Sequence, residues 1–384
     1  MPMSRGQISI LCTAIAASTM AATIMQGCGG LPRSRSQRPV SVERRAKAFE
    51  IDHESWAQLG YALDWRGFPR VGGGESVTFL NVYDDIVAVQ ESGSYLTVLE
   101  AATGQTRWSE ELANRLTRFV GLTRLDQGTL LSCAEGEAYF IHMDTGAMLR
   151  RQRFEKVATT APVITGNYII FGTGGGELMA HSMSTGFKAW GIATGRSITR
   201  EPTLVGGIVS SISQDGSLIF VNASSGTLLR RNRTAGRIGL ETDPVTDGQY
   251  LFVASLDQSI YAFDPQTGAR IWRIRTSRPL TEQPIVHQDT LYCSIIGEGF
   301  AAIDTVSGSR RWTAQGIDGS LVAVRGGNLL IWNGTEAVLL DPARGDVIKQ
   351  VELPGITMLV PDAFVDGNLY AVSKLGVIAK FMPR

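Results

Sequence analysis

A unit of about 40 residues recurs along most of this 384-residue chain, and the recurrence constrains the fold more than any other feature. The clearest copy runs from Tyr261 to Trp272, where an apolar run, a turn containing Gly268 and a second run ending in tryptophan follow one another. A glycine turn between two such runs predicts a β-hairpin. The turn glycines of the seven copies are Gly104, Gly146, Gly186, Gly226, Gly268, Gly308 and Gly345.

A second turn lies upstream of each of these hairpins, between two further apolar runs. Each unit is therefore expected to hold four short strands, which is the size of one β-propeller blade. The eight copies of this upstream turn are Asp84-Asp85, Gln127-Gly128, Gly166-Asn167, Gly206-Gly207, Asp247-Gly248, Gln288-Asp289, Gly326-Gly327 and Asp366-Gly367.

The two counts differ, because eight upstream hairpins are followed by seven downstream ones. The chain stops at Arg384, directly after the third strand of the last unit. A blade that lacks its fourth strand would expose an apolar edge, so the missing strand is expected from the residues before the first unit, within Trp56–Trp65. The sequence predicts an all-β fold over residues 55–384: an eight-bladed propeller of four-stranded antiparallel blades, closed by an N-terminal strand.

The first residues have the pattern of an export signal. Arg5 precedes an apolar run from Ile8 to Met25, and Cys28 follows between two glycines. This arrangement resembles a bacterial lipoprotein signal peptide, which implies that residues 1–27 are removed and that Cys28 is lipidated. By the same resemblance, the glycine after Cys28 favours the outer membrane. An uncleaved anchor is one alternative, since about 18 apolar or weakly polar residues barely cross a bilayer, and a cytoplasmic protein is the other.

Residues 28–54 are expected to form a basic, flexible tether. This stretch is rich in Pro, Ser and Arg, and from residue 29 to residue 47 Glu43 is its single acid. It holds too little apolar surface to form a core. The tether gives the propeller reach from the membrane, and its positive charge is also suited to anionic head groups.

The composition gives no sign of a catalytic, metal or cofactor site. His53, His142, His181 and His287 are far apart and lack partners at metal-ligand spacing. No nucleophile elbow or phosphate loop is present. With 36 basic and 36 acidic residues, nothing favours nucleic-acid binding. We expect no enzyme activity, no metal and no cofactor.

Two cysteines remain in the expected propeller. Cys133 and Cys293 fall in second strands of the second and sixth blades, on opposite sides of the ring. A disulfide requires Cα atoms within about 7 Å. We therefore expect both to be buried and unpaired.

The residues around the turn glycine match a known repeat. The pattern Ala-x-Asp-x-x-Thr/Ser-Gly-x-x-x-Trp is complete at Ala262–Trp272 and Ala302–Trp312, and nearly so at Ala180–Trp190 and Val98–Trp108. It resembles the quinoprotein-type propeller repeat, in which the tryptophan docks against the neighbouring blade. The expected docking residues are Trp108, Trp190, Trp272 and Trp312. Arg150, Arg230 and Lys349 take this position in three other blades, where their aliphatic stems are expected to form weaker seals.

Two families share this repeat. The pyrroloquinoline-quinone dehydrogenases bind the quinone and calcium, and they carry a vicinal cysteine pair that this sequence lacks. The chain more closely resembles, over nearly its whole length, the lipoprotein B subunit of the bacterial β-barrel assembly machinery. That resemblance implies a monomeric, non-catalytic scaffold on the periplasmic face of the outer membrane, held there by its lipid. The alternatives are a quinoprotein-related ligand-binding protein or quinone-dependent enzyme, and a propeller scaffold of another envelope complex.

The resemblance also implies a partner surface. In that family, loops that lead into inner strands of central blades contact periplasmic domains of the barrel-forming subunit, and unfolded outer-membrane proteins are the clients. The matching loops here end at Pro202 and Pro244. The interface candidates are Arg200, Glu201, Glu241 and Asp243. The alternative is that these are solvent-facing charges at the channel mouth.

Overall fold

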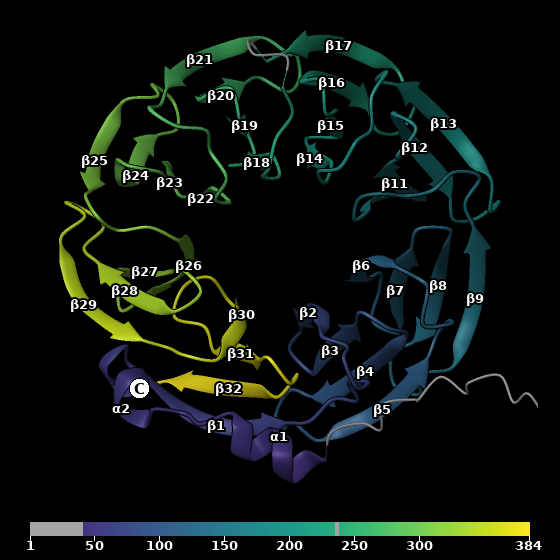
Figure 1. The fold of residues 1–384 in the computed structure, drawn as a ribbon. Helices are drawn as coiled ribbons and strands as arrows, with labels where there is room; N and C mark the ends of the chain where they lie inside the picture. Colours follow the sequence, from purple (N-terminus) through teal and green to yellow (C-terminus); the bar gives the residue numbers. More distant parts are fainter. Residues whose placement is uncertain (1–40, 235–237) are drawn as a thin grey trace, which may run out of the picture. The chain divides into compact units, whose positions relative to one another are not determined.

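The computed structural model describes residues 41–234 and 238–384. By its internal contacts the chain divides into residues 1–36 and residues 37–384, and the described residues belong to the second unit. They form eight four-stranded antiparallel sheets, which Figure 1 shows arranged as blades around a ring. The predicted all-β, eight-bladed propeller is confirmed. The expected signal peptide, Cys28 and the first part of the tether lie outside the described residues.

Each blade has an inner, a second, a third and an outer strand, and blade 1 begins at β2. The inner strands are β2 (Val77–Val82), β6 (Phe119–Arg124), β10 (Val163–Thr165), β14 (Thr203–Val205), β18 (Val245–Thr246), β22 (Ile285–His287), β26 (Ser320–Arg325) and β30 (Ile356–Pro361). The second strands are β3 (Ile86–Glu91), β7 (Thr129–Ala134), β11 (Tyr168–Gly172), β15 (Ile208–Ile212), β19 (Leu251–Ser255), β23 (Thr290–Ile295), β27 (Asn328–Trp332) and β31 (Leu369–Ser373). The third strands are β4 (Tyr95–Glu100), β8 (Glu137–His142), β12 (Glu177–Ser182), β16 (Ser217–Asn222), β20 (Ser259–Phe263), β24 (Gly299–Asp304), β28 (Glu336–Leu340) and β32 (Ile378–Pro383). The outer strands are β5 (Thr106–Glu111), β9 (Met148–Arg153), β13 (Lys188–Ala193), β17 (Leu228–Arg233), β21 (Arg270–Arg275), β25 (Arg310–Ala314), β29 (Val347–Glu352) and β1 (Tyr61–Gly67).

The core of the propeller lies in the seams between blades. Successive side chains of a strand point to opposite faces, so each third strand serves two seams. Strand β16 belongs to blade 4. Its Ile219 and Val221 pack in the cluster shared with blade 3, whereas its Leu218 and Phe220 pack in the cluster shared with blade 5. The described residues form eight such clusters, one for each seam. Burying one such side chain is worth about 1.5–3 kcal/mol, so the seams are the main source of stability.

The docking tryptophans join one blade to the next. The indole Nε1 of Trp108 in blade 1 donates to the carbonyl of Met143 in blade 2 at 2.7 Å. Gly146, three residues later, has φ +74°, and the Trp108 ring occupies the place of its missing Cβ. This turn therefore requires glycine both for its backbone and for the ring beside it. The same donation recurs from Trp190 to Ala223 (3.1 Å), Trp272 to Thr305 (2.9 Å) and Trp312 to Pro342 (2.8 Å), and also from Trp65 of β1 to Ala101 (3.0 Å).

Arg150 and Lys349 occupy the docking position in two blades that lack tryptophan there, and different contacts replace the indole in each. Arg150 lies 3.9 Å from the Phe140 ring centroid and donates to the carbonyl of Met183, so its guanidinium repeats the bond that an indole would make. Lys349 has no turn of this kind to dock on, because the third and outer strands of blade 8 come from opposite ends of the chain. Helix α2 (His53–Gln58) contacts β29 there, and its buried Trp56 stacks on Phe381 with ring centroids 3.5 Å apart.

The ring is closed by pairing of β1 with β32, from Tyr61 opposite Pro383 to Gly67 opposite Ile378. Closure by the N-terminal region is confirmed: β1 begins at Tyr61, inside the expected stretch Trp56–Trp65, and ends two residues beyond it at Gly67. Residues 53–58 are helical because the Asp52 carboxylate accepts from the first backbone amides of α2.

Arg325 of blade 7 holds this junction where the other blades have a hairpin turn. Its guanidinium donates to the carbonyl of Gly60 at 3.1 and 3.2 Å and to the carboxylate of Asp366 at 2.7 Å. It also donates to the carbonyl of Arg384, whose own amide donates to Gly60 at 2.9 Å. The residue before β1 and the C-terminal residue are thus joined through one side chain.

Residues 42–54 differ from the expected flexible tether. Helix α1 (Val42–Ala48) is fixed by the buried Arg45. Its guanidinium donates to the carbonyls of Leu375 at 2.9 Å, Gly376 at 2.7 Å and Pro69 at 2.8 Å. Phe49 is buried in the seam between blades 7 and 8. The attachment depends on loops far away in the sequence, so local composition does not reveal it.

Substitution of Trp108 by Ala tests the docking arrangement. It should lower the free energy of unfolding by about 3–4 kcal/mol, because a buried ring and its hydrogen bond are lost together. The measurement is the urea midpoint with an unchanged slope. Lys349→Ala, at the same position of blade 7, should change stability by about 0.5 kcal/mol or less. Equal losses in the two variants would contradict the docking role.

Substitution of Arg325 by Met tests the junction. Methionine keeps most of the aliphatic stem of Arg325 but removes the donors to the carbonyls of Gly60 and Arg384. The free energy of unfolding should therefore fall by about 2–3 kcal/mol. Hydrogen exchange should become faster at Leu63 and Phe381 and stay unchanged at Ile170 in blade 3. Uniform acceleration across the blades would show that Arg325 has no specific role in closure.

Candidate functional site on the entry face

One face of the propeller is built from the loops that enter the inner strands and the turns between second and third strands; we call it the entry face. Backbone hydrogen bonds join the two sets. The amide of Ile198 donates to Thr173 at 3.2 Å, and the amide of Gln214 donates to Ser197 at 2.9 Å. The entering loop of blade 4 is therefore fixed to turns of blades 3 and 4.

The four predicted interface residues come together on this face. The guanidinium of Arg200 pairs with the carboxylate of Glu241 at 2.9 Å and donates to the carbonyl of Leu240 at 3.1 Å. The amide of Glu201 donates to the carboxylate of Asp243 at 2.8 Å. Glu201 and Asp243 each precede a proline, which favours an extended backbone at the residue before it. The two loops are therefore expected to have similar backbone conformations at these positions.

Gln283 extends this cluster into blade 6, and the sequence interpretation did not include it. Its side-chain carbonyl accepts from the amide of Asp243 at 3.0 Å, and its amide group donates to the Asp243 carbonyl at 3.2 Å. Gln283 precedes Pro284 just as Glu201 precedes Pro202, so alignment on the prolines would have found it. Loops of blades 4, 5 and 6 are thus connected through polar side chains.

Glu201 also borders the central channel. A cavity of about 280 Å³ there is lined by Phe79 of blade 1, Leu122 of blade 2, Pro162 of blade 3 and Glu201 of blade 4. Water reaches the Glu201 carboxyl, yet protein atoms of four blades surround it. This burial, and secondly the charge of Asp243, raises the pKa of Glu201 to about 7.

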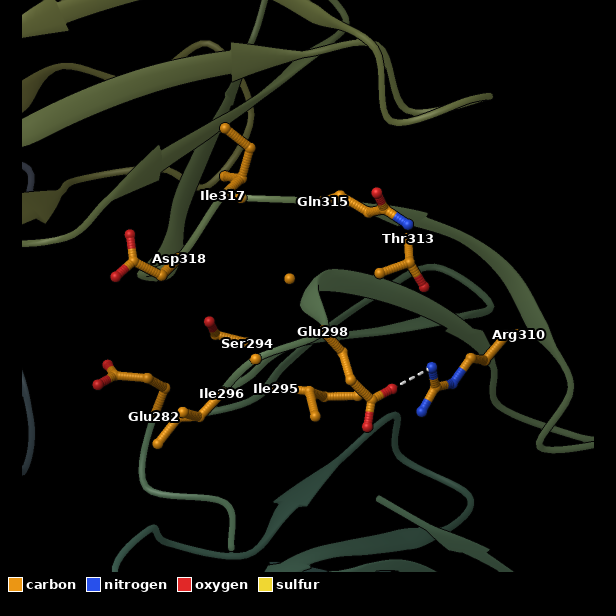
Figure 2. A pocket seen from close by; sticks show the side chains of 13 residues that line it. Glu282, Ser294, Ile295, Ile296, Glu298, Arg310, Thr313, Gln315, Ile317 and Asp318 are labelled. Carbon is orange, nitrogen blue, oxygen red and sulfur yellow. Dashed lines mark ion pairs between the residues drawn. The ribbon is translucent and has the colours of Figure 1, made fainter. Parts of the chain in front are cut away.

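A larger hollow of about 820 Å³ opens on the same face where blades 6 and 7 meet. Figure 2 shows Glu282 and Asp318 on one side of it and the ion pair of Glu298 with Arg310 on the other. Ile296, about half exposed, adds apolar surface. The entry face therefore offers fixed charges and a concave region, both of which suit contact with another macromolecule.

The described residues contain no group of three or more His, Cys, Asp or Glu side chains that could hold a metal ion. Cys133 and Cys293 are buried and unpaired, as predicted, and burial raises the pKa of Cys293 to about 12. Among the same residues, no helix is both long and apolar enough to cross a bilayer.

The pKa of Glu201 predicts a pH effect. A carboxyl whose pKa is raised from 4.5 to about 7 by folding favours the folded state below pH 4.5 and loses this contribution as the pH rises through 7. Glu201→Gln should thus match the parent protein near pH 4 and be more stable above pH 7. The gain should be roughly 1 kcal/mol or less, because water screens the charge. NMR titration of the Glu201 side chain checks the cause directly, and a midpoint near 4.5 would contradict it.

Comparisons with known proteins agree with the propeller fold. A profile of the family described as outer membrane protein assembly factor BamB matches residues 134–238 and 214–381. The outer membrane protein assembly factor BamB of Shewanella oneidensis is 25% identical over 238 residues, covering 58% of this chain and 59% of that protein. The chain thus matches about three fifths of the length of this relative.

Two solved structures share the fold. The computationally designed Ika8 protein has a TM-score of 0.68 at 15% identity, over 83% of this chain and 99% of that one. BamB from Moraxella catarrhalis has a TM-score of 0.64 at 17% identity, over 80% and 96% of the two chains. At these identities the structural matches establish the fold alone. The profile match, however, spans more than half of the sequence. The chain therefore belongs to the outer membrane protein assembly factor BamB family.

Proposed function

We propose that this protein is a non-catalytic scaffold that aids the assembly and insertion of β-barrel proteins at the bacterial outer membrane. Membership of a family named for outer membrane protein assembly supports this role. We further propose that lipidation at Cys28 anchors the chain on the periplasmic side of that membrane. Helix α1 is bound to blade 8 through Arg45. Force applied through the tether would therefore act on the packed propeller and not on β1 alone.

The observation that carries this proposal is the connected polar cluster of the entry face. Arg200 contacts Glu241, Glu201 contacts Asp243, and Asp243 contacts Gln283, so loops of three blades hold one arrangement before any partner arrives. Little ordering entropy is then lost on binding. The proposed partners are periplasmic domains of the barrel-forming subunit, with unfolded outer-membrane proteins as clients.

Affinity capture from cross-linked membranes tests the proposed process. The full-length protein should recover the barrel-forming subunit. Consistent recovery of a different envelope complex, without that subunit, would contradict the proposed role. A saturable thermal shift with pyrroloquinoline quinone and calcium, together with alcohol-dependent dye reduction, would contradict the non-catalytic assignment.

A double charge swap tests the proposed interface. Arg200→Glu combined with Glu241→Arg keeps an ion pair between the two loops but reverses the charge pattern that a partner meets. Stability should change by about 0.5 kcal/mol or less, and recovery of the barrel-forming subunit should fall about tenfold.

The matched control is Arg118→Glu with Glu135→Arg, an exposed ion pair on the entry face of blade 2. This control should bind as the parent protein does. Unaltered recovery with the blade 4 and 5 swap, or equal losses in the two swaps, would mean that the interface lies elsewhere.

A further inference from the structure

Positive charge is concentrated on the outer strands of five consecutive blades. Strands β9, β13, β17, β21 and β25, of blades 2 to 6, together hold twelve Lys and Arg residues and no Asp or Glu. The whole chain, by contrast, has 36 basic and 36 acidic residues. Figure 1 shows these strands along one continuous arc of the rim.

Several of these charges are neutralised within the blade, and others are not. Arg151 pairs with Glu137 at 2.6 Å, and Arg311 pairs with Asp289 and with Asp304 at 2.7 Å each. On β17 and β21 the situation differs. Six arginines lie there, and we call them the arginine rim: Arg230, Arg231, Arg233, Arg270, Arg273 and Arg275. Among the described residues the one carboxylate within 4 Å of them is Asp215, at 3.7 Å from Arg233.

The two strands of the arginine rim are held next to each other. The stem of Arg230 lies against Gly268, whose missing Cβ would meet it at 2.5 Å. The amide group of Asn232 also donates to the carbonyl of Gly268, two residues before Arg270. Arg230 of β17 therefore adjoins the beginning of β21, and positive charge accumulates across the seam.

Apolar side chains accompany the charges on this rim. Leu228, Leu229 and Ile271 are 39%, 43% and 45% exposed. Each outer strand is also the last strand of its sheet, so one side of its backbone has no strand partner within the described residues. Unpaired backbone, exposed aliphatic groups and unneutralised arginines together form a surface suited to an extended polypeptide.

We propose that the arginine rim is a second binding surface, which takes an extended acidic segment of another protein. Carboxylates fit the planar guanidinium fork, and an acidic strand supplies the negative charge that β17 and β21 lack. The surface curves along the ring, so a flexible chain can follow both strands, whereas a flat membrane meets only part of them. This surface is separate from the entry face and does not depend on the proposed function.

Charged side chains on edge strands also prevent unwanted sheet pairing. That role alone requires charge on every exposed edge, whether neutralised or not. It does not account for the contrast between Arg151 and Arg311, which have carboxylate partners, and Arg230, Arg270 and Arg275, for which no interaction with a described carboxylate is found. Arginines with and without carboxylate partners can therefore be compared directly by substitution.

The test compares two triple variants of the full-length protein with equal net charge. Arg230→Gln, Arg270→Gln and Arg275→Gln removes unneutralised guanidiniums. Arg107→Gln, Arg151→Gln and Arg311→Gln removes three others that already pair with carboxylates, also on outer strands. The probe is a fluorescent peptide of about 15 residues in which glutamate alternates with valine and threonine, residues that favour extended structure.

The parent protein should bind the probe with an affinity that falls as salt increases. The rim variant should bind about tenfold more weakly, from a loss of about twofold for each exposed charge, and the paired-arginine variant should change less than about twofold. A lysine version of the peptide should not bind. Equal losses of affinity in both variants would show that net charge alone is responsible for binding. Binding to phosphatidylglycerol vesicles but not to the peptide would show that the arginine rim binds lipid instead. Either result overturns the proposal. The Arg200 and Glu241 swap should leave probe binding unchanged.

Discussion

The pairing of β1 with β32 is the interaction on which the rest of the structure depends. Each blade packs only against its two neighbours, so an open ring would expose to water the apolar faces that blades 8 and 1 now pack together. The junction has no covalent turn, and Arg325 substitutes for one by binding Gly60 and Arg384 together. Trp56 of α2 packs in the adjoining seam, between blades 7 and 8.

Much of the fold could be predicted because the propeller repeats its own contacts. The glycine column, the tryptophan column and the unequal number of hairpins are all local patterns, and together they give eight blades and an N-terminal closing strand. What escaped prediction depends on single contacts between distant residues. Arg45 donates to the carbonyl of Gly376, which lies 331 residues further along the chain. Nothing in the sequence around Arg45 distinguishes it from the other arginines of the tether. Helix α2 carried a usable signal, since Asp52 is a favourable N-cap residue.

The candidate site was predictable in its location and less so in its chemistry. Proline at the start of inner strands marked the loops that hold Arg200 and Asp243, because proline sets extended backbone on the residue before it. The sequence could not show that Arg200 pairs with Glu241, nor that Glu201 borders the channel, since both depend on how neighbouring blades are placed. The arginine rim is similar. Its basic residues are visible in the sequence, but only the fold shows that most of them have no carboxylate partner among the described residues.

Ring closure can be measured directly with a disulfide across the junction. Ala62 and Met382 are Cα partners in the β1 and β32 register, and such partners in an antiparallel pair lie within disulfide range. Ala62→Cys with Met382→Cys should therefore oxidise completely in the folded protein and raise the urea midpoint, because the bond closes a loop of more than 300 residues. Failure to form this bond in the folded protein would contradict closure of the propeller by its N-terminal strand.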